Sequence, residues 1–304
     1  RKLSTDQMKN LSKYMAVICM TAAIALPSCT HKSEDSRPVI AVSIEPQRNI
    51  LRQIAGDRFN IVTVIPKNES PETFEPSPSK RMEIENASIY FTTGLFIFED
   101  NLKLATDDES KFINTSEGID LIYEVSHGDN HSKFLPTIPP GTDEIEADPH
   151  VWLSLRNVRR IAANMADCLI QIDPGNAGEY KTNLRKMNAR IDSLDNVFAA
   201  RIARAGSPAF MLWHPSMGYF ARDYGLKMIT MGHENKEVSA TTLKALIDSA
   251  RTENARLFLF QNLIDSRQAE SISSSTGARL VKFDPLAYDW EAELSKVVDE
   301  LSQQ

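Results

Sequence analysis

The sequence has no excess of basic residues. Against 41 Asp and Glu there are 34 Lys and Arg, and the formal net charge of −7 argues against a nucleic-acid-binding protein. Its twelve glycines and fifteen prolines form no collagen-like repeat. Long hydrophobic runs are also scarce, since the one strongly apolar segment, residues 14–26, is too short to span a bilayer comfortably. What is present, 304 residues of which 42% are hydrophobic and 25% charged, is typical of a globular protein of about two domains.

The apolar segment at 14–26 has the features of an export signal, because two lysines precede it and small residues follow it. It ends in Leu26-Pro27-Ser28-Cys29, which resembles the lipobox of bacterial lipoproteins, where the cysteine carries lipid. A plain signal peptide with an incidental cysteine is the alternative. The predicted segments are a signal and lipobox over residues 1–29, with the natural start at Met8 and the lipid on Cys29, and a polar tether over residues 30–37.

The three cysteines leave no pair for an internal disulfide in the mature chain. Cys19 would leave with the signal and Cys29 would carry the lipid, so Cys168 would stand alone. Cys168 lies among apolar residues of an expected helix, and we interpret it as a small buried side chain rather than a reactive thiol. We expect the mature protein to be a lipid-anchored monomer.

Short β-rich runs alternate with helical patterns in both halves of the chain. Such alternation predicts β-α-β units and parallel sheets covered by helices. The expected strands are 39–44, 61–65, 89–93 and 112–115 in the first half, and 209–213, 227–231, 257–260 and 280–283 in the second. The expected helices are 46–56, 79–87, 95–104, 155–172, 216–224, 241–254, 266–276 and 290–301.

A longer helical pattern separates the two halves. Asp173-Pro174 is a helix-start signal, and apolar residues from Tyr180 to Phe198 then recur at steps of three and four, up to a stop near Gly206. The sequence therefore predicts an α/β protein of two lobes joined by one long helix, with a ligand cleft between the lobes. Each lobe is expected to have its own core and a mostly parallel four-stranded sheet flanked by helices. The expected parts are an N-terminal α/β lobe at 38–172, the linking helix at 173–206 and a C-terminal α/β lobe at 207–304.

The residues that could carry chemistry follow predicted strands. His214 and Asp284 come directly after the first and last strands of the second half, and Glu72 lies in the loop after the second strand of the first half. Because ligands bind at the carboxyl ends of parallel strands, we expect these side chains at one cleft, together with His150. Two imidazoles and two carboxylates are suitable ligands for a divalent transition metal, although a lone histidine in such a setting is more often structural.

Six short motifs occur in the order found in one protein family. They are Gln53–Phe59 (QIAGDRF), Ser70–Ser79 (SPETFEPSPS), Asp148–Ser154 (DPHVWLS), Asp173–Ala177 (DPGNA), His214–Phe220 (HPSMGYF) and Asp284–Leu286 (DPL). From Val39 to the C-terminus the chain thereby resembles the metal-capturing solute-binding proteins of bacterial zinc and manganese ABC importers, solute-binding family 9 or cluster A-I. The resemblance implies two lobes joined by a single long helix, with the metal held between them. It puts the metal ligands at Glu72, His150, His214 and Asp284.

One position departs from the family pattern. Members usually carry His where this chain has Glu72, followed by the same aromatic-Glu-Pro sequence. Glu72 can coordinate through oxygen; the alternatives are that it binds poorly, that Glu75 substitutes for it, or that the site is degenerate. Glu75 is otherwise interpreted as a residue that orients a ligand.

The expected metal is Zn²⁺, with Mn²⁺ or iron as the alternative. Zinc accepts His and carboxylate ligands, usually four of them, whereas manganese tolerates more oxygen. The resemblance implies more His in zinc carriers and an acid at the position of His214 in manganese carriers. His127 and His131 lie in a short polar loop that resembles a reduced form of the His-rich loop of zinc importers; a plain surface loop explains them equally well.

An enzymatic function is not expected. The chain has no H-E-x-x-H, G-x-S-x-G or phosphate-binding G-x-x-x-x-G-K-[ST] motif, and four protein ligands leave little room for an activated water. A receptor for a metal chelate would need an aromatic or Arg-lined cleft, and the paired histidines argue against this function. A surface lipoprotein could also act as an adhesin in addition to binding metal. We therefore expect an extracytoplasmic bacterial lipoprotein, facing the periplasm or on the cell surface, that captures one divalent metal ion and delivers it to an ABC permease in the membrane.

Overall fold

The computed structural model describes residues 37–125, 133–135, 145–206, 209–231, 239–261 and 266–303. These residues belong to one compact unit that begins at Arg37. The predicted signal and lipobox with Cys29, the tether up to residue 36, and the loop with His127 and His131 lie outside the described residues and stay predictions. Within the described part of the chain, no helix has both the length and the apolar character needed to cross a membrane.

The first half of the chain forms a parallel sheet with the strand order β2-β1-β3-β4. Its strands are β1 (Val39–Val42), β2 (Asn60–Thr63), β3 (Ile89–Thr92) and β4 (Phe112–Asn114), and its helices are α2 (Glu45–Ala55), α3 (Pro78–Glu85) and α4 (Ile97–Leu104). Ile40 of the inner strand β1 pairs with Ile61 on one side and Ile89 on the other. All four predicted strands are present, each ending one or two residues before its predicted end.

The second half repeats this connectivity in a second parallel sheet, ordered β11-β10-β8-β9. Its strands are β8 (Ala209–Leu212), β9 (Lys227–Thr230), β10 (Leu257–Phe260) and β11 (Arg279–Lys282), and its helices are α7 (Gly218–Tyr224), α8 (Ala240–Thr252), α9 (Ser266–Thr276) and α10 (Trp290–Ser302). In both sheets the chain reverses its direction of progress between the first and third strands, which is where open α/β sheets bind ligands. The predicted fold class of two four-stranded parallel sheets flanked by helices is confirmed.

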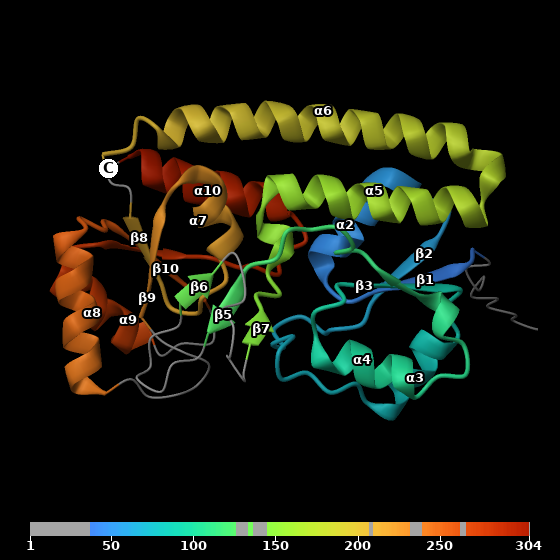
Figure 1. The fold of residues 1–304 in the computed structure, drawn as a ribbon, viewed down its shortest axis with the longest axis horizontal. Coiled ribbons are helices and arrows are strands. Elements are labelled where there is room, and N and C mark those ends of the chain that lie inside the picture. The colour runs from blue at the N-terminus through green and yellow to red at the C-terminus, as the bar shows by residue number, and fades with distance from the viewer. Residues whose placement is uncertain are drawn as a thin grey trace, which may run out of the picture. The chain divides into compact units, whose positions relative to one another are not determined.

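One long helix runs along both sheets (Figure 1). This helix, α6 (Ala177–Ile202), has 26 residues and packs on α2 and α5 (Leu155–Ile172) from the first half and on α10 from the second. It is shorter than the predicted segment 173–206. Pro174–Asn176 forms a separate 3-10 turn, held by Asn176 Nδ2 donating to the Asp173 carboxylate, and the chain after Ile202 also tightens into turns.

A small antiparallel sheet was not predicted. It has the order β6-β5-β7, with β5 at Tyr123–Val125, β6 at Lys133–Leu135 and β7 at Ile145–Ala147. Strands of three residues are too short to show the alternation by which a strand is detected in a sequence. Strand β7 matters for the site because the chain leaves it directly into Asp148, whose amide donates to Ile122 O at 2.8 Å.

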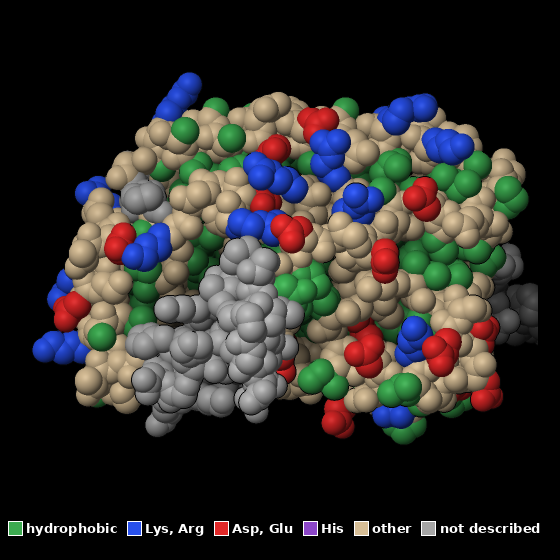
Figure 2. Space-filling view, in the orientation of Figure 1, with side chains coloured by type: hydrophobic (Ala, Val, Ile, Leu, Met, Phe, Trp, Pro, Cys, Tyr) green, Lys and Arg blue, Asp and Glu red, His purple; other side chains and the backbone are tan. Residues whose placement is uncertain are grey.

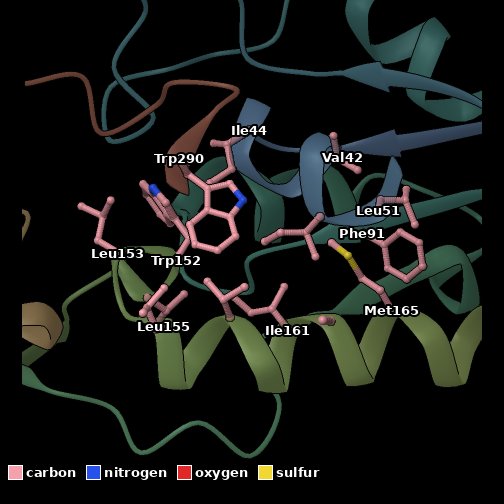
Figure 3. Packing of buried hydrophobic residues seen from close by; sticks show 14 of the residues in the cluster. Val42, Ile44, Leu51, Phe91, Trp152, Leu153, Leu155, Ile161, Met165 and Trp290 are labelled. Carbon is pink, nitrogen blue, oxygen red and sulfur yellow. The ribbon is translucent and has the colours of Figure 1, made fainter. Parts of the chain in front are cut away.

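The apolar core continues from the first sheet to the second, so the expectation of a separate core for each lobe is wrong. One cluster of buried residues includes Val42 and Phe91 of the first sheet, Trp152, Trp290 of α10, and Leu259 of the second sheet. In Figure 3, Trp152 and Trp290 lie beside Ile44 of the first half. A second cluster covers only the other face of the second sheet. The cores merge because large aromatic side chains fill the space between the two sheets.

Cys168 lies in α5 with 9% of its surface exposed. Burial raises the pKa of its thiol to about 11, so the thiol is protonated at neutral pH. The interpretation of Cys168 as a buried apolar side chain is therefore confirmed.

The outer surface carries charges of both signs. On the face drawn in Figure 2, Lys and Arg side chains lie over α5 and α6 with Asp and Glu between them. This mixture agrees with the absence of a basic excess in the sequence.

Candidate metal site

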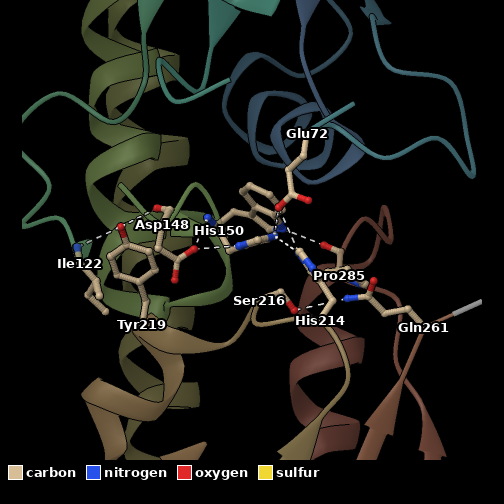
Figure 4. Close-up of polar contacts among 10 residues, drawn as sticks. Glu72, Ile122, Asp148, His150, His214, Ser216, Tyr219, Gln261 and Pro285 are labelled. Carbon is tan, nitrogen blue, oxygen red and sulfur yellow. Dashed lines mark hydrogen bonds and ion pairs between the residues drawn. The ribbon is translucent and has the colours of Figure 1, made fainter. Parts of the chain in front are cut away.

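Three predicted ligands come from three separate segments of the chain. Glu72 lies in the loop between β2 and α3, His150 lies between β7 and α5, and His214 follows β8. The loop of Glu72 is anchored by Phe74, which is buried and packs edge-on against Phe98 with ring centroids 5.1 Å apart. In Figure 4 the three side chains converge on one point from these segments.

The ligand atoms of Glu72, His150 and His214 form a small triangle. His214 Nε2 lies 3.1 Å from Glu72 Oε1 and 3.2 Å from His150 Nε2, and His150 Nε2 lies 3.6 Å from Glu72 Oε1. Two ligands of a tetrahedral zinc ion with bonds of about 2.0–2.1 Å lie roughly 3.3 Å apart. The three separations therefore match one face of such a tetrahedron.

The triangle is largely shielded from solvent. The exposed fractions of the side chains are 9% for His150, 17% for His214 and 20% for Glu72. Partial burial weakens the competition of water for these ligand atoms, while the remaining exposure leaves the ion a path to them.

Asp148 holds the His150 ring in place. Its Oδ1 accepts from the His150 amide at 2.9 Å and lies 2.8 Å from His150 Nδ1. An ionised carboxylate only accepts hydrogen bonds, so Nδ1 carries the proton and Nε2 presents its lone pair to the site. Tyr219 OH donates to Asp148 O at 2.7 Å and fixes the backbone of the same residue. Sequence analysis missed the role of Asp148, although a carboxylate two residues before a candidate histidine was a usable signal.

Asp284 lies farther from the triangle than predicted. It lines the same cavity but is not among the residues whose ligand atoms lie within 4.8 Å of one another, a group made of Glu72, His150 and His214. Its Oδ1 accepts from Leu286 N at 3.0 Å, which turns the carboxylate toward its own loop. Next to it, Pro285 O accepts from the Trp152 indole at 2.7 Å, and this bond ties the Asp284 loop to the segment of His150.

Glu75 is the other predicted site residue within the described part of the chain, and it is not brought to the triangle. Glu75 is exposed and does not line the cavity. Its predicted roles, as a substitute ligand or as a residue that orients one, have no geometric support in the described structure.

The triangle lies at a cavity of about 570 Å³. The cavity is lined by residues of both halves, among them Ile44, Arg48, Trp213, Phe283 and Tyr288. It is therefore the ligand cleft between the two sheets that the strand-end positions predict.

Comparison with known proteins agrees with this arrangement. A family model described as ZnuA, the zinc-uptake complex component A, periplasmic, matches residues 40–302. The chain belongs to this family. As a member it is a metal-binding component of an ABC importer, and the predicted resemblance is confirmed.

Relatives of the ZnuA family have different metals in their names. High-affinity zinc uptake system protein ZnuA of Bacillus subtilis (strain 168) is 26% identical over 260 residues, which cover 83% of this chain and 80% of that protein. Manganese ABC transporter substrate-binding lipoprotein PsaA of Streptococcus anginosus is 24% identical over 285 residues, covering 88% and 87%. A crystal structure of a zinc-bound ZnuA with residues 138–173 deleted is 32% identical, has a TM-score of 0.74 and covers 88% of this chain and 97% of that one.

Proposed function

We propose that this protein captures one Zn²⁺ ion outside the cytoplasm and delivers it to an ABC permease in the membrane. The observation that carries the proposal is the triangle of Glu72, His150 and His214, whose ligand atoms lie 3.1–3.6 Å apart. Family membership supports a carrier rather than an enzyme, and the cargo is released rather than converted. Among the relatives, the zinc system of Bacillus subtilis supports zinc, PsaA makes manganese the second candidate, and the iron ABC transporter substrate-binding lipoprotein MtsA of Streptococcus pyogenes adds iron.

The donor set favours zinc over manganese. Two imidazole nitrogens suit a borderline metal such as zinc, whereas manganese prefers sites rich in oxygen. Glu72 adds one oxygen ligand, and Asp284 is proposed as the fourth ligand. Asp284 would have to exchange its hydrogen bond with Leu286 N for the metal, a change confined to one loop.

We also propose that the mature protein is anchored through lipid on Cys29. The lipobox-like sequence supports the anchor, and the name of PsaA as a lipoprotein agrees with it.

Metal content tests the proposed function. Protein purified without chelators should contain one zinc per chain by elemental analysis. The metal-free protein should then bind zinc more tightly than manganese in a competition titration against a chromophoric chelator. Tighter binding of manganese than of zinc would contradict the assignment of the metal. Failure to bind either metal would contradict the proposed function.

A further inference from the structure

The cavity beside the triangle is much larger than one metal ion needs. Its volume of about 570 Å³ falls within the range of roughly 300–1,000 Å³ that is typical of pockets for small organic molecules. An ion held by side chains occupies only the space between its ligands. The remaining volume can therefore accommodate an organic group bound to the same ion.

The walls of the cavity suit such a group. Trp213, Phe283, Leu286 and Tyr288 provide aromatic and apolar surface. Arg48 provides a guanidinium that lies 5.6 Å from the centroid of the Tyr288 ring. These are the features that a metal-chelate receptor needs, and here they occur beside metal ligands of the protein itself.

The position of Arg48 points to a carboxylate-bearing partner. Its Nη1 donates to Glu45 at 3.2 Å, and a guanidinium has five N–H groups in all, so one carboxylate does not exhaust its donors. Its side chain is 40% exposed, which leaves it accessible from the cavity.

The charges of the lining decide which form of the chelator binds. Arg48 and Lys67 line the cavity together with the four acids Glu45, Glu69, Glu72 and Asp284. This excess of carboxylates attracts the complex, because a divalent cation with one monoanionic chelator has a net positive charge, whereas the free amino-carboxylate is a zwitterion without net charge at neutral pH and gains no such attraction.

We propose that the site takes up the metal as a complex with one small amino-carboxylate chelator. Glu72, His150 and His214 bind the ion, and the chelator binds it through its amine and one carboxylate oxygen, which together replace Asp284 and make the ion five-coordinate. The free end of its carboxylate accepts from Arg48, and its apolar part packs against Tyr288 and Trp213. This inference rests on the proposed function, since it names the form of the same cargo.

Native mass spectrometry with zinc and L-histidine tests the inference. The metal-free protein should gain the mass of zinc from zinc alone, nothing from L-histidine alone, and the mass of one zinc plus one L-histidine from the mixture. Imidazole, which has a donor nitrogen but no carboxylate, should bind the zinc-loaded protein at least tenfold more weakly in calorimetry. If the mixture adds only zinc, or if L-histidine strips the zinc, the inference is wrong and the proposed function stands; if zinc alone does not bind, the proposed function itself fails.

Variants locate the chelator. Arg48→Met should weaken L-histidine binding to the zinc-loaded protein at least tenfold and leave zinc binding unchanged. Arg52→Met is the matched control, because Arg52 lies one turn farther along α2 and does not line the cavity. Tyr288→Ala, at a side chain that is 42% exposed, gives a second variant that removes the aromatic wall and keeps the Arg48 guanidinium. Asp284→Ala should weaken the binding of zinc alone and keep the affinity for the complex of zinc with L-histidine.

Two results would overturn the inference. One is an equal loss of affinity for zinc and for the complex in Asp284→Ala, and the other is binding of L-histidine at wild-type affinity by Arg48→Met and Tyr288→Ala.

Discussion

Replacing Asp148 tests whether the metal affinity depends on how the His150 ring is held. The Asp148 carboxylate is 1% exposed and makes two short contacts with His150, at 2.8 Å to Nδ1 and 2.9 Å to the amide nitrogen. Loss of a partner that orients a metal-binding histidine costs about 10–100-fold in affinity. Asp148→Asn keeps an oxygen acceptor and removes only the charge, so we expect a loss of about tenfold, or about 1.4 kcal/mol. Asp148→Ala removes both contacts and should approach a hundredfold.

The assay is a titration of metal-free protein with zinc in competition with a chromophoric chelator. Thermal melts of the metal-free variants show whether the fold is kept. Tyr219→Phe is the matched control, because it removes the hydrogen bonds of the hydroxyl with the Asp148 carbonyl and the Ile122 amide but leaves the carboxylate on His150. This control should lose about 1 kcal/mol of stability and little affinity. Wild-type affinity in folded Asp148→Asn and Asp148→Ala would refute the reasoning, and equal losses in Tyr219→Phe would show that only the backbone matters.

Further predictions concern the ligands and the cysteines. His150→Ala or His214→Ala should each lower zinc affinity about a hundredfold, since four ligands together provide roughly 10–16 kcal/mol, and each should reduce the rise in melting temperature that zinc causes in the wild type. Glu72→Gln should weaken binding by removing the charge, whereas Glu72→His should raise the ratio of zinc to manganese affinity; competition titrations that match wild type for both variants would exclude Glu72 as a ligand. Cys29→Ala should move the protein from the membrane to the soluble fraction, and unchanged partitioning would exclude the lipid anchor. Because burial raises the pKa of Cys168 to about 11, its alkylation at pH 7.5 should be slow in the folded protein and fast in denaturant.

The two parallel sheets and the long helix were predictable because turn signals clearly bound their elements. Short β-rich runs between turn signals gave all eight strands of the two parallel sheets, and the stripe from Tyr180 to Phe198 gave the long helix. The three-residue strands β5, β6 and β7 have no such signal, since hydrogen bonds to distant strands and not local periodicity define them. The merged core was missed for a related reason: the partners of Trp152 and Trp290 come from the other half of the chain.

The part of the site that could be predicted is the part whose residues follow directly from the ends of strands. The rule that ligands bind at the carboxyl ends of parallel strands predicted Glu72, His214 and Asp284 at one cleft, His150 was added from its apolar setting, and the family resemblance gave the same four residues as ligands. Strand ends do not determine how a side chain is oriented within a loop. Asp284 is the example, because its Oδ1 accepts from Leu286 N two residues ahead. Asp148 was missed although its contact with His150 spans only two residues, because a sequence does not show whether such a carboxylate faces the ring or the solvent.

The connections between the two halves explain how three ligands from separate segments keep separations of 3.1–3.6 Å. Asn49 of α2 accepts from the Trp290 indole of α10 at 3.2 Å. Arg190 Nη2 of α6 lies 2.6 Å from the largely buried carboxylate of Glu291, the residue after Trp290. Together with the common core, these contacts fix the first sheet against the second, so the positions of His150 and His214 are determined by the whole frame. Binding then requires little ordering of these ligands, and the free energy of coordination is retained as affinity. The Asp284 carboxylate bonds to Leu286 N of its own loop and lies outside this triangle, and we propose that it yields its place when the ion arrives as a complex.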